Sequence, residues 1–168
     1  MDYNYNKIIA DIKSGKYSLM GTGSSRIVYD LNDGFVVKIA KDIRGIFQNE
    51  AEHKTYLSHK SNLFAEVMAV SEDNRLLIMP KAKKIKNIRP VLKYYNARSI
   101  KSLFNHDKLI ISDIQDNGLS TNDLYRVSSW GFINNVPLII DYGLTHSIYK
   151  KFYGHNRLFK KYKSIHYL

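Results

Sequence analysis

Apolar and polar residues alternate in short runs along the first half of the sequence, a pattern typical of antiparallel strands. Residues 17–40 predict three strands, separated by a Gly-rich turn and by an Asn-Asp-Gly turn at 32–34. EVMAV at 66–70 and RLLIMP at 75–80 predict a further strand pair around the polar turn at 71–74. The first half of the chain is therefore expected to form a small antiparallel sheet.

Two other parts of the chain have apolar residues at helical spacing. Residues 44–60 predict one helix, with Phe47, Ala51 and Leu57 near one face. A second helical zone begins at Pro90, a residue suited to the first turn of a helix. Its approximate apolar stripe comprises Val91, Leu92, Tyr95, Ile100, Leu103 and Phe104.

A last strand pair, SSWGFI and VPLIID, is predicted to turn at Asn134 and Asn135. Residues 81–89 are too polar and too basic for a core, so we expect them to connect two lobes. The predicted fold class is α+β, in a single domain. A small β-rich N-terminal lobe with one helix spans residues 1–82, and a reduced, mainly helical C-terminal lobe spans residues 83–168.

Composition narrows the possible functions. The 168 residues carry a net charge of +11, so an acidic partner is expected: nucleotide phosphates, nucleic acid, an acidic protein or an anionic surface. The absence of cysteine excludes disulfides, thiolate zinc sites and cysteine nucleophiles. No apolar run is long enough to span a bilayer, and the start lacks a signal-peptide core. We expect a cytoplasmic protein without a membrane partner, in the host cytoplasm if a phage encodes it.

The stretch GTGSSRIV at 21–28 poses a choice between a phosphate-binding loop and a plain hairpin turn. Gly21 and Gly23 let backbone N–H groups approach phosphate oxygens, and Val28 can cover a base. Arg26 stands where a third glycine would complete the pattern, and would either stiffen the loop or add a cation over the phosphates. A strand follows the glycines, whereas a dinucleotide-binding fold needs a helix there, which excludes that fold.

Lys38 lies within the apolar strand FVVKIA, on the same face as Val36 and Ala40. A lysine among apolar residues needs an anion nearby, although a lysine on an edge strand can also simply prevent aggregation. The helix that follows offers Glu50, which helical spacing places on the inward side, and Glu52, which it places toward solvent. Lys38 and Glu50 are therefore expected to pair and direct the ammonium at phosphates.

In the order of these parts, the sequence resembles the protein kinase superfamily. The Gly-rich loop, Lys38 and Glu50 look like the N-terminal lobe of a kinase, and Asp141-Tyr142-Gly143 is similar to the Asp-Phe-Gly signature. Asp123 precedes Asp141 by the separation usual between the catalytic-loop aspartate and the metal-binding aspartate. The resemblance spans residues 17–145.

The resemblance implies an ATP-dependent serine/threonine protein kinase that uses Mg²⁺. Asp123 would orient the acceptor hydroxyl of a protein substrate, Lys38 would hold the phosphates, and Asp141 would bind magnesium. The position of a second metal ligand, usually asparagine, falls on Ser128. The nucleotide-binding residues implied are Gly21, Gly23, Ser24, Val28, Val36, Lys38 and Glu50.

Several departures from the kinase pattern keep a second interpretation open. Asp113 is a rival to Asp123, but its distance from Asp141 is too long. Only 25 residues follow Gly143, too few for the usual helical platform that binds peptides. The chain could instead be a catalytically inactive kinase-like protein that captures nucleic acid or an acidic protein through its basic surface.

The basic, aromatic C-terminal stretch, residues 146–168, allows two interpretations. It could bind a phosphate backbone while its rings stack on bases. It could also form amphipathic helices that cover the C-terminal lobe. The residues expected to face inward are Ile148, Phe152, Leu158, Phe159 and Tyr162.

Overall fold

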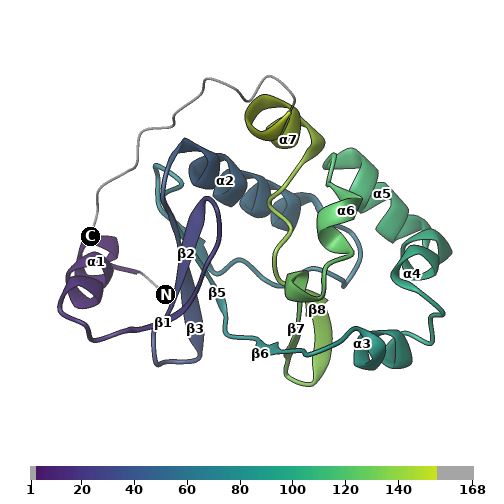
Figure 1. Ribbon diagram of the computed structural model, residues 1–168, viewed down its shortest axis with the longest axis horizontal. Helices are drawn as coiled ribbons and strands as arrows, with labels where there is room; N and C mark the ends of the chain where they lie inside the picture. The colour runs from purple at the N-terminus through teal and green to yellow at the C-terminus, as the bar shows by residue number, and fades with distance from the viewer. Residues whose placement is uncertain (1–2, 155–168) are drawn as a thin grey trace.

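A computed structural model describes residues 3–154 of the chain. Its N-terminal half is a five-stranded antiparallel sheet with strand order β1-β2-β3-β5-β4 (Figure 1). The strands are β1 (Ser18–Thr22), β2 (Arg26–Asp30), β3 (Phe35–Ala40), β4 (Ala69–Val70) and β5 (Leu76–Pro80). The predicted three-strand meander and the later strand pair are confirmed, although β4 is shorter than predicted.

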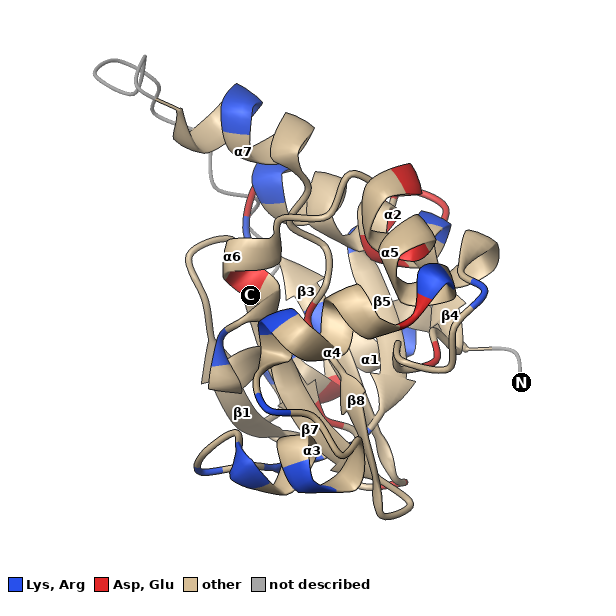
Figure 2. Ribbon diagram, turned by 90° about the vertical axis from the view of Figure 1, so that its right-hand side faces the viewer, with Lys and Arg blue, Asp and Glu red and all other residues tan. Residues whose placement is uncertain are grey.

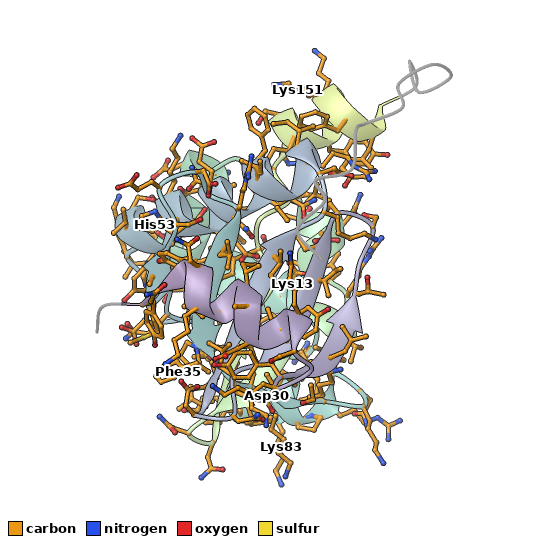
Figure 3. The ribbon with its side chains drawn as sticks, turned by 90° about the vertical axis from the view of Figure 1, so that its left-hand side faces the viewer. Lys13, Asp30, Phe35, His53, Lys83 and Lys151 are labelled. Carbon is orange, nitrogen blue, oxygen red and sulfur yellow. The ribbon has the colours of Figure 1, made fainter. Side chains whose placement is uncertain are left out.

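The two faces of this sheet have different roles. Helix α1 (Tyr5–Lys13), which the sequence pattern did not reveal, lies across one face (Figure 3). Its buried residues Ile8 and Ile12 pack on Val37 and Ile39 of β3. The alternate residues of β3 face the other way, toward the second half of the chain. Val36 and Lys38 are thereby presented to that side.

Helix α2 (Ile43–Ser58) follows β3 and confirms the helix predicted over 44–60. The second half of the chain contains mostly short helices and a small three-stranded sheet. These elements are β6 (Lys83–Lys84), α3 (Arg89–Tyr94), α4 (Ile100–His106), α5 (Lys108–Asp116), α6 (Thr121–Leu124), a 3₁₀ helix (Val127–Ser129), β7 (Trp130–Ile133), β8 (Val136–Ile139) and α7 (His146–Tyr153).

Local signals explain the breaks between these elements. The predicted helical zone after residue 90 is divided because Asn96 adopts a left-handed conformation (φ 48°) and Ser99 caps the next helix. Asn134 and Asn135 are both left-handed, as a tight hairpin turn requires, which confirms the predicted turn between β7 and β8. The predicted α+β fold class is confirmed.

The segment between α2 and β4 is hydrogen-bonded to strand β8. Ile139 donates its N–H to the carbonyl of Leu63 and accepts the N–H of Ala65, each at 2.9 Å. Around this contact a continuous core joins the two halves and includes the buried rings of Trp130 and Tyr142. The strand that leads to Asp141 is therefore attached directly to the N-terminal half.

Toward the C-terminus, Ile148 and Phe152 of α7 are buried, as the amphipathic interpretation expects. Leu158, Phe159 and Tyr162 lie outside the described residues. Within residues 3–154, none of the helices has the length and apolar character that crossing a membrane requires.

Candidate active site

A cavity of about 550 Å³ lies beside the Gly-rich loop and contains nearly all the residues proposed from the sequence. Those that line it are Gly21, Gly23, Ser24, Val28, Val36, Lys38, Asp123, Ser128 and Asp141. They come from β1, the loop between β1 and β2, β2, β3, α6, the 3₁₀ helix and the segment after β8. The fold thus brings together residues that are up to 120 positions apart in the sequence. Only Glu50 is absent from this set.

The Gly-rich loop connects β1 to β2 and is held at several points. Gly23 donates its N–H to the carbonyl of Arg26 at 2.8 Å, which closes the turn. Lys41 contacts the same turn, because its Nζ lies 3.1 Å from the carbonyl oxygen of Gly23. Arg44 Nη2 donates to the carbonyl of Ser24 at 3.1 Å. The loop is therefore a turn anchored to the start of α2.

The anion beside Lys38 is Glu52, so the predicted pairing with Glu50 is wrong. Lys38 Nζ lies 2.9 and 2.8 Å from the two carboxylate oxygens of Glu52, and both side chains are buried. Glu50 is partly exposed and pairs with Lys54 one helical turn away. Burial disfavours the charge on both partners. It lowers the pKa of Lys38, whereas Arg26 and Lys38 together lower the pKa of Glu52 to about 2.

The prediction failed because the inward face of α2 is polar. The residues that α2 buries are Gly45, Gln48, Asn49, Glu52 and Thr55. The apolar residues used to choose the face lie elsewhere: Leu57 is 70% exposed, and Phe47 packs on Phe152 of α7. The signal that could have identified Glu52 was this run of small and polar residues at helical spacing.

The Arg26 side chain points into the protein, where its guanidinium lines the inner wall of the cavity. Its guanidinium donates to Asn49 Oδ1 at 3.2 Å and to Glu52 Oε1 at 3.1 Å, and it forms an ion pair with Asp141. Burial opposes this charge, but Glu52 and Asp141 raise the pKa of Arg26 above its ordinary value. The cavity therefore has two buried cations on its inner wall, Arg26 and Lys38.

Glu52 also fixes the segment that carries Asp141. One of its oxygens accepts the backbone N–H groups of Tyr142 and Gly143, both at 3.1 Å. Gly143 passes so close to α2 that an added Cβ would lie 2.4 Å from the carbonyl oxygen of Gln48. The buried carboxylate thus links Lys38, Arg26 and the Asp-Tyr-Gly segment, and it holds Asp141 at the cavity wall.

Asp123 lies in α6 and also lines the cavity. Arg126 is its ion-pair partner at 3.3 Å. Burial and the charge of Asp141 raise the pKa of Asp123, so this carboxylate is a better proton acceptor than an exposed one. The rival Asp113 is only 1% exposed and accepts the N–H groups of Lys60 and Ser61, a structural role away from the cavity.

The oxygen atoms available in the cavity suit Mg²⁺. The Asp141 side chain is 45% exposed, and Asp123 and Ser128 line the same cavity. Across residues 3–154, no group of three His, Cys, Asp or Glu side chains is arranged to hold a metal ion by itself. Mg²⁺ commonly binds through one or two carboxylates together with substrate phosphates. These residues therefore fit a magnesium ion whose coordination a nucleotide completes.

Helix α7 contributes residues that sequence reasoning missed. Tyr149 and Tyr153 both line the cavity. The hydroxyl of Tyr153 lies 3.3 Å from Gln48 Nε2 and 3.4 Å from the hydroxyl of Ser24. The start of the C-terminal stretch therefore closes one side of the cavity, next to the tip of the Gly-rich loop.

Comparisons with known proteins give matches among solved structures alone. The sequence matches no protein-family model and no curated protein. Among solved structures that do match is the ternary complex of streptomycin, ATP and APH(2")-IIa, with 19% sequence identity and a TM-score of 0.45. The match covers 85% of this chain and 72% of that chain.

The arrangement of elements agrees with the one expected from the sequence, except that Glu52 and not Glu50 pairs with Lys38. A β-rich N-terminal half with one long helix precedes a mainly helical half. The ion pair between Lys38 and Glu52 lies next to Asp141, with Lys38 Nζ 4.0 Å from Asp141 Oδ1. The chain therefore has an α+β fold in which the buried Lys38–Glu52 pair lies beside Asp141.

Proposed function

We propose that the chain is an ATP-dependent phosphotransferase. The observation that carries this proposal is the convergence of three charged groups on one cavity beside the Gly-rich loop. Lys38 is held by the buried Glu52, and Asp141 and Asp123 line the same cavity. A site built only for binding anions has no need of two carboxylates next to its cations.

The cavity offers each part of ATP a suitable surface. Val28, Val36 and Met79 provide apolar contacts for the base. Lys38 and Arg26 provide positive charge for the phosphates, and the backbone of Gly21 and Gly23 allows close approach. Mg²⁺ held by Asp141, with Asp123 and Ser128 beside it, would neutralise charge that develops during transfer.

Asp123 is assigned the role of orienting the acceptor hydroxyl and accepting its proton. Its raised pKa supports this role, because proton transfer is most effective when the pKa of the base is closer to the operating pH. Within the class of hydroxyl acceptors we propose serine or threonine of a protein. The chemistry is then transfer of the γ-phosphoryl group of ATP to that oxygen, with release of ADP.

Intact-mass spectrometry after incubation with Mg-ATP tests the proposal. The reactions contain a basic acceptor protein, or a small-molecule alcohol in its place. We expect the wild type and Asp116→Asn to transfer phosphate to the acceptor and Asp123→Asn to lose this transfer. Asp116→Asn is the control because Asp116 is exposed and lies outside the cavity. Gain on the small molecule alone would exclude a protein acceptor. No gain, together with no binding of a non-hydrolysable ATP analogue, would overturn the proposal.

A second function, nucleic-acid binding, is favoured by a separate surface. From residue 74 to residue 106 the chain contains no Asp or Glu. We define the basic face as Lys83, Lys86, Arg89, Lys93, Arg98 and Lys101, all of which are exposed. Among the described residues, none of the six has an ion-pair partner.

The basic face surrounds α3, where Lys and Arg segments gather at the bottom of Figure 2. Lys83 points away from the body of the protein, at the end opposite Lys151 (Figure 3). Tyr94 on α3 is 53% exposed among these cations. Cations that contact phosphates and an exposed ring on which a base can stack are the elements of single-stranded nucleic-acid binding.

Fluorescence anisotropy with a labelled single-stranded oligonucleotide tests this second function. Reversing two charges, Lys93→Glu with Arg98→Glu, should weaken binding at least about tenfold and reduce its salt dependence. Lys7→Glu with Lys13→Glu on α1 is the control with the same charge change, at the other side of the molecule in Figure 1. Equal losses in both variants would exclude a localised site. Binding of polyglutamate but not of the oligonucleotide would assign an acidic protein instead.

A further inference from the structure

Arg26 forms an ion pair with Asp141, the carboxylate that the proposed function requires for metal binding. Its Nη2 contacts Oδ1 of Asp141 and lies 3.1 Å from Oε1 of Glu52. The Arg26 side chain is buried, whereas Asp141 is partly exposed to the cavity. The ion pair therefore has one fixed partner inside the protein and one partner that a ligand can reach.

The other contacts of Arg26 hold its guanidinium in this position. Asn49 accepts from Arg26 through Oδ1, and its own Nδ2 donates to the carbonyls of Asn74 and Arg75 at 2.9 and 3.2 Å. The Asn49 oxygen is thereby turned toward Arg26. The guanidinium is thus placed by the sheet and by α2, independently of Asp141.

The charges of this buried cluster balance only when Asp141 is included. Arg26 and Lys38 carry two positive charges, and Glu52 carries one negative charge within the protein. Asp141 supplies the second negative charge, since it contacts Arg26 and lies 4.0 Å from Lys38 Nζ. Withdrawing Asp141 from Arg26 would leave a buried cation without full compensation, which is unfavourable.

A divalent cation bound to Asp141 would lie next to the guanidinium of Arg26. Two positive charges at this separation repel each other, and the repulsion is stronger beside the buried guanidinium than it would be in bulk water. We propose that Arg26 is a positioning residue that keeps Asp141 from binding a divalent cation until a nucleotide is present. This inference rests on the proposed function. Phosphate oxygens brought by the nucleotide offer Arg26 a replacement for Asp141, and the carboxylate is then released to the metal.

The consequence is that metal and nucleotide bind in a coupled way. If Arg26 weakens metal binding in the free protein more than in the nucleotide complex, each ligand must strengthen the binding of the other by the same factor. A protein without the cation at position 26 would bind the metal alone more tightly and would show less coupling.

Electron paramagnetic resonance of Mn²⁺ tests whether Arg26 weakens metal binding to the nucleotide-free protein. The measurement needs neither a nucleotide nor an activity assay. The affinity of Mn²⁺ for the nucleotide-free protein is measured in the wild type, Arg26→Gln and Arg26→Lys. We expect at least about tenfold tighter binding in Arg26→Gln, and an affinity within about threefold of the wild type in Arg26→Lys, which keeps the charge. Lys84→Gln removes another cation that lines the cavity but does not contact Asp141, and should have little effect.

A double variant, Arg26→Gln with Asp141→Asn, checks that the tighter Mn²⁺ binding occurs at Asp141. This double variant should lose the gain in Mn²⁺ affinity that Arg26→Gln shows. Unchanged Mn²⁺ affinity in Arg26→Gln, or tighter binding that survives Asp141→Asn, would overturn the inference. Near-ultraviolet circular dichroism verifies the fold of each variant. If Arg26→Gln does not fold, tight binding by the nucleotide-free wild type would overturn it equally. Failure of ATP-analogue binding would count against the proposed function and would leave the Mn²⁺ result interpretable.

Discussion

Both carboxylate oxygens of Glu52 accept hydrogen bonds from the ammonium of Lys38, at 2.9 and 2.8 Å. Glu52→Gln preserves the shape of the side chain but leaves Lys38 and Arg26 with one negative charge too few. Breaking a buried ion pair from one side typically costs about 3–5 kcal/mol. We expect urea unfolding to show a loss of this size.

Glu50→Gln is the matched control for that measurement. Glu50 lies on the same helix, two positions earlier, and pairs with the exposed Lys54. Exposed pairs of this kind contribute about 0.5 kcal/mol or less. Equal losses in the two variants would contradict the central position of Glu52.

The stability that Glu52 contributes should depend on pH in the acidic range. The pKa of Glu52 is lowered from 4.5 to about 2, so the folded state holds the ionised form more strongly than the unfolded state does. The contribution is therefore complete above about pH 4.5 and is lost as the pH falls toward 2. The difference in unfolding free energy between the wild type and Glu52→Gln should narrow over this interval. A difference that stays constant down to pH 3 would contradict the lowered pKa.

Gly45→Ala should destabilise the fold, although alanine favours helices. A Cβ at Gly45 would lie 2.3 Å from the carbonyl oxygen of Ser25 and 2.8 Å from Cα of Ala40, both in the backbone. Overpacking of this kind costs about 1–3 kcal/mol. Thermal unfolding should show the loss. In Gly21→Ala, where the added Cβ meets nothing within 4 Å, the melting temperature should hardly change.

Asp113→Asn tests whether Asp113 has a structural role while Asp123 has the catalytic one. Asp113 accepts the N–H groups of Lys60 and Ser61 on its two oxygens, each at 2.8 Å, and asparagine has only one oxygen to offer. Loss of one hydrogen bond to a charged acceptor should cost about 1.5–3 kcal/mol. Urea unfolding measures this cost, and any phosphotransfer should persist below the unfolding transition. Loss of phosphotransfer without loss of stability would reverse the two assignments.

Much of the fold could be predicted because its signals are local. Alternation in FVVKIA placed Val36 and Lys38 on one face of β3, and the structure confirms that both line the cavity. The turn at Asn134 and Asn135 follows from residues that tolerate a left-handed backbone. The spacing between Asp123 and Asp141 pointed to two carboxylates that do line one cavity.

The partner of Lys38 could not be predicted in the same way. Helical spacing shows which residues of α2 share a face, but it does not show which face turns inward. That choice was made on apolar residues, and the buried face of α2 is polar because it packs against Lys38 and Arg26. The Arg26 side chain points inward to contact Asp141, which lies 115 positions later in the sequence. No local sequence pattern encodes a contact over this separation.

The two backbone hydrogen bonds of Ile139 constrain how the cavity can open. They attach β8 to the segment between α2 and β4, only two residues before Asp141. A hinge rotation of one half against the other would have to break both bonds and part the core around Tyr142. The tip of the Gly-rich loop is held less firmly on its cavity side, where the Ser24 hydroxyl lies 3.4 Å from the hydroxyl of Tyr153. We therefore expect a nucleotide to enter by displacement of this loop, while the two halves move as one rigid body.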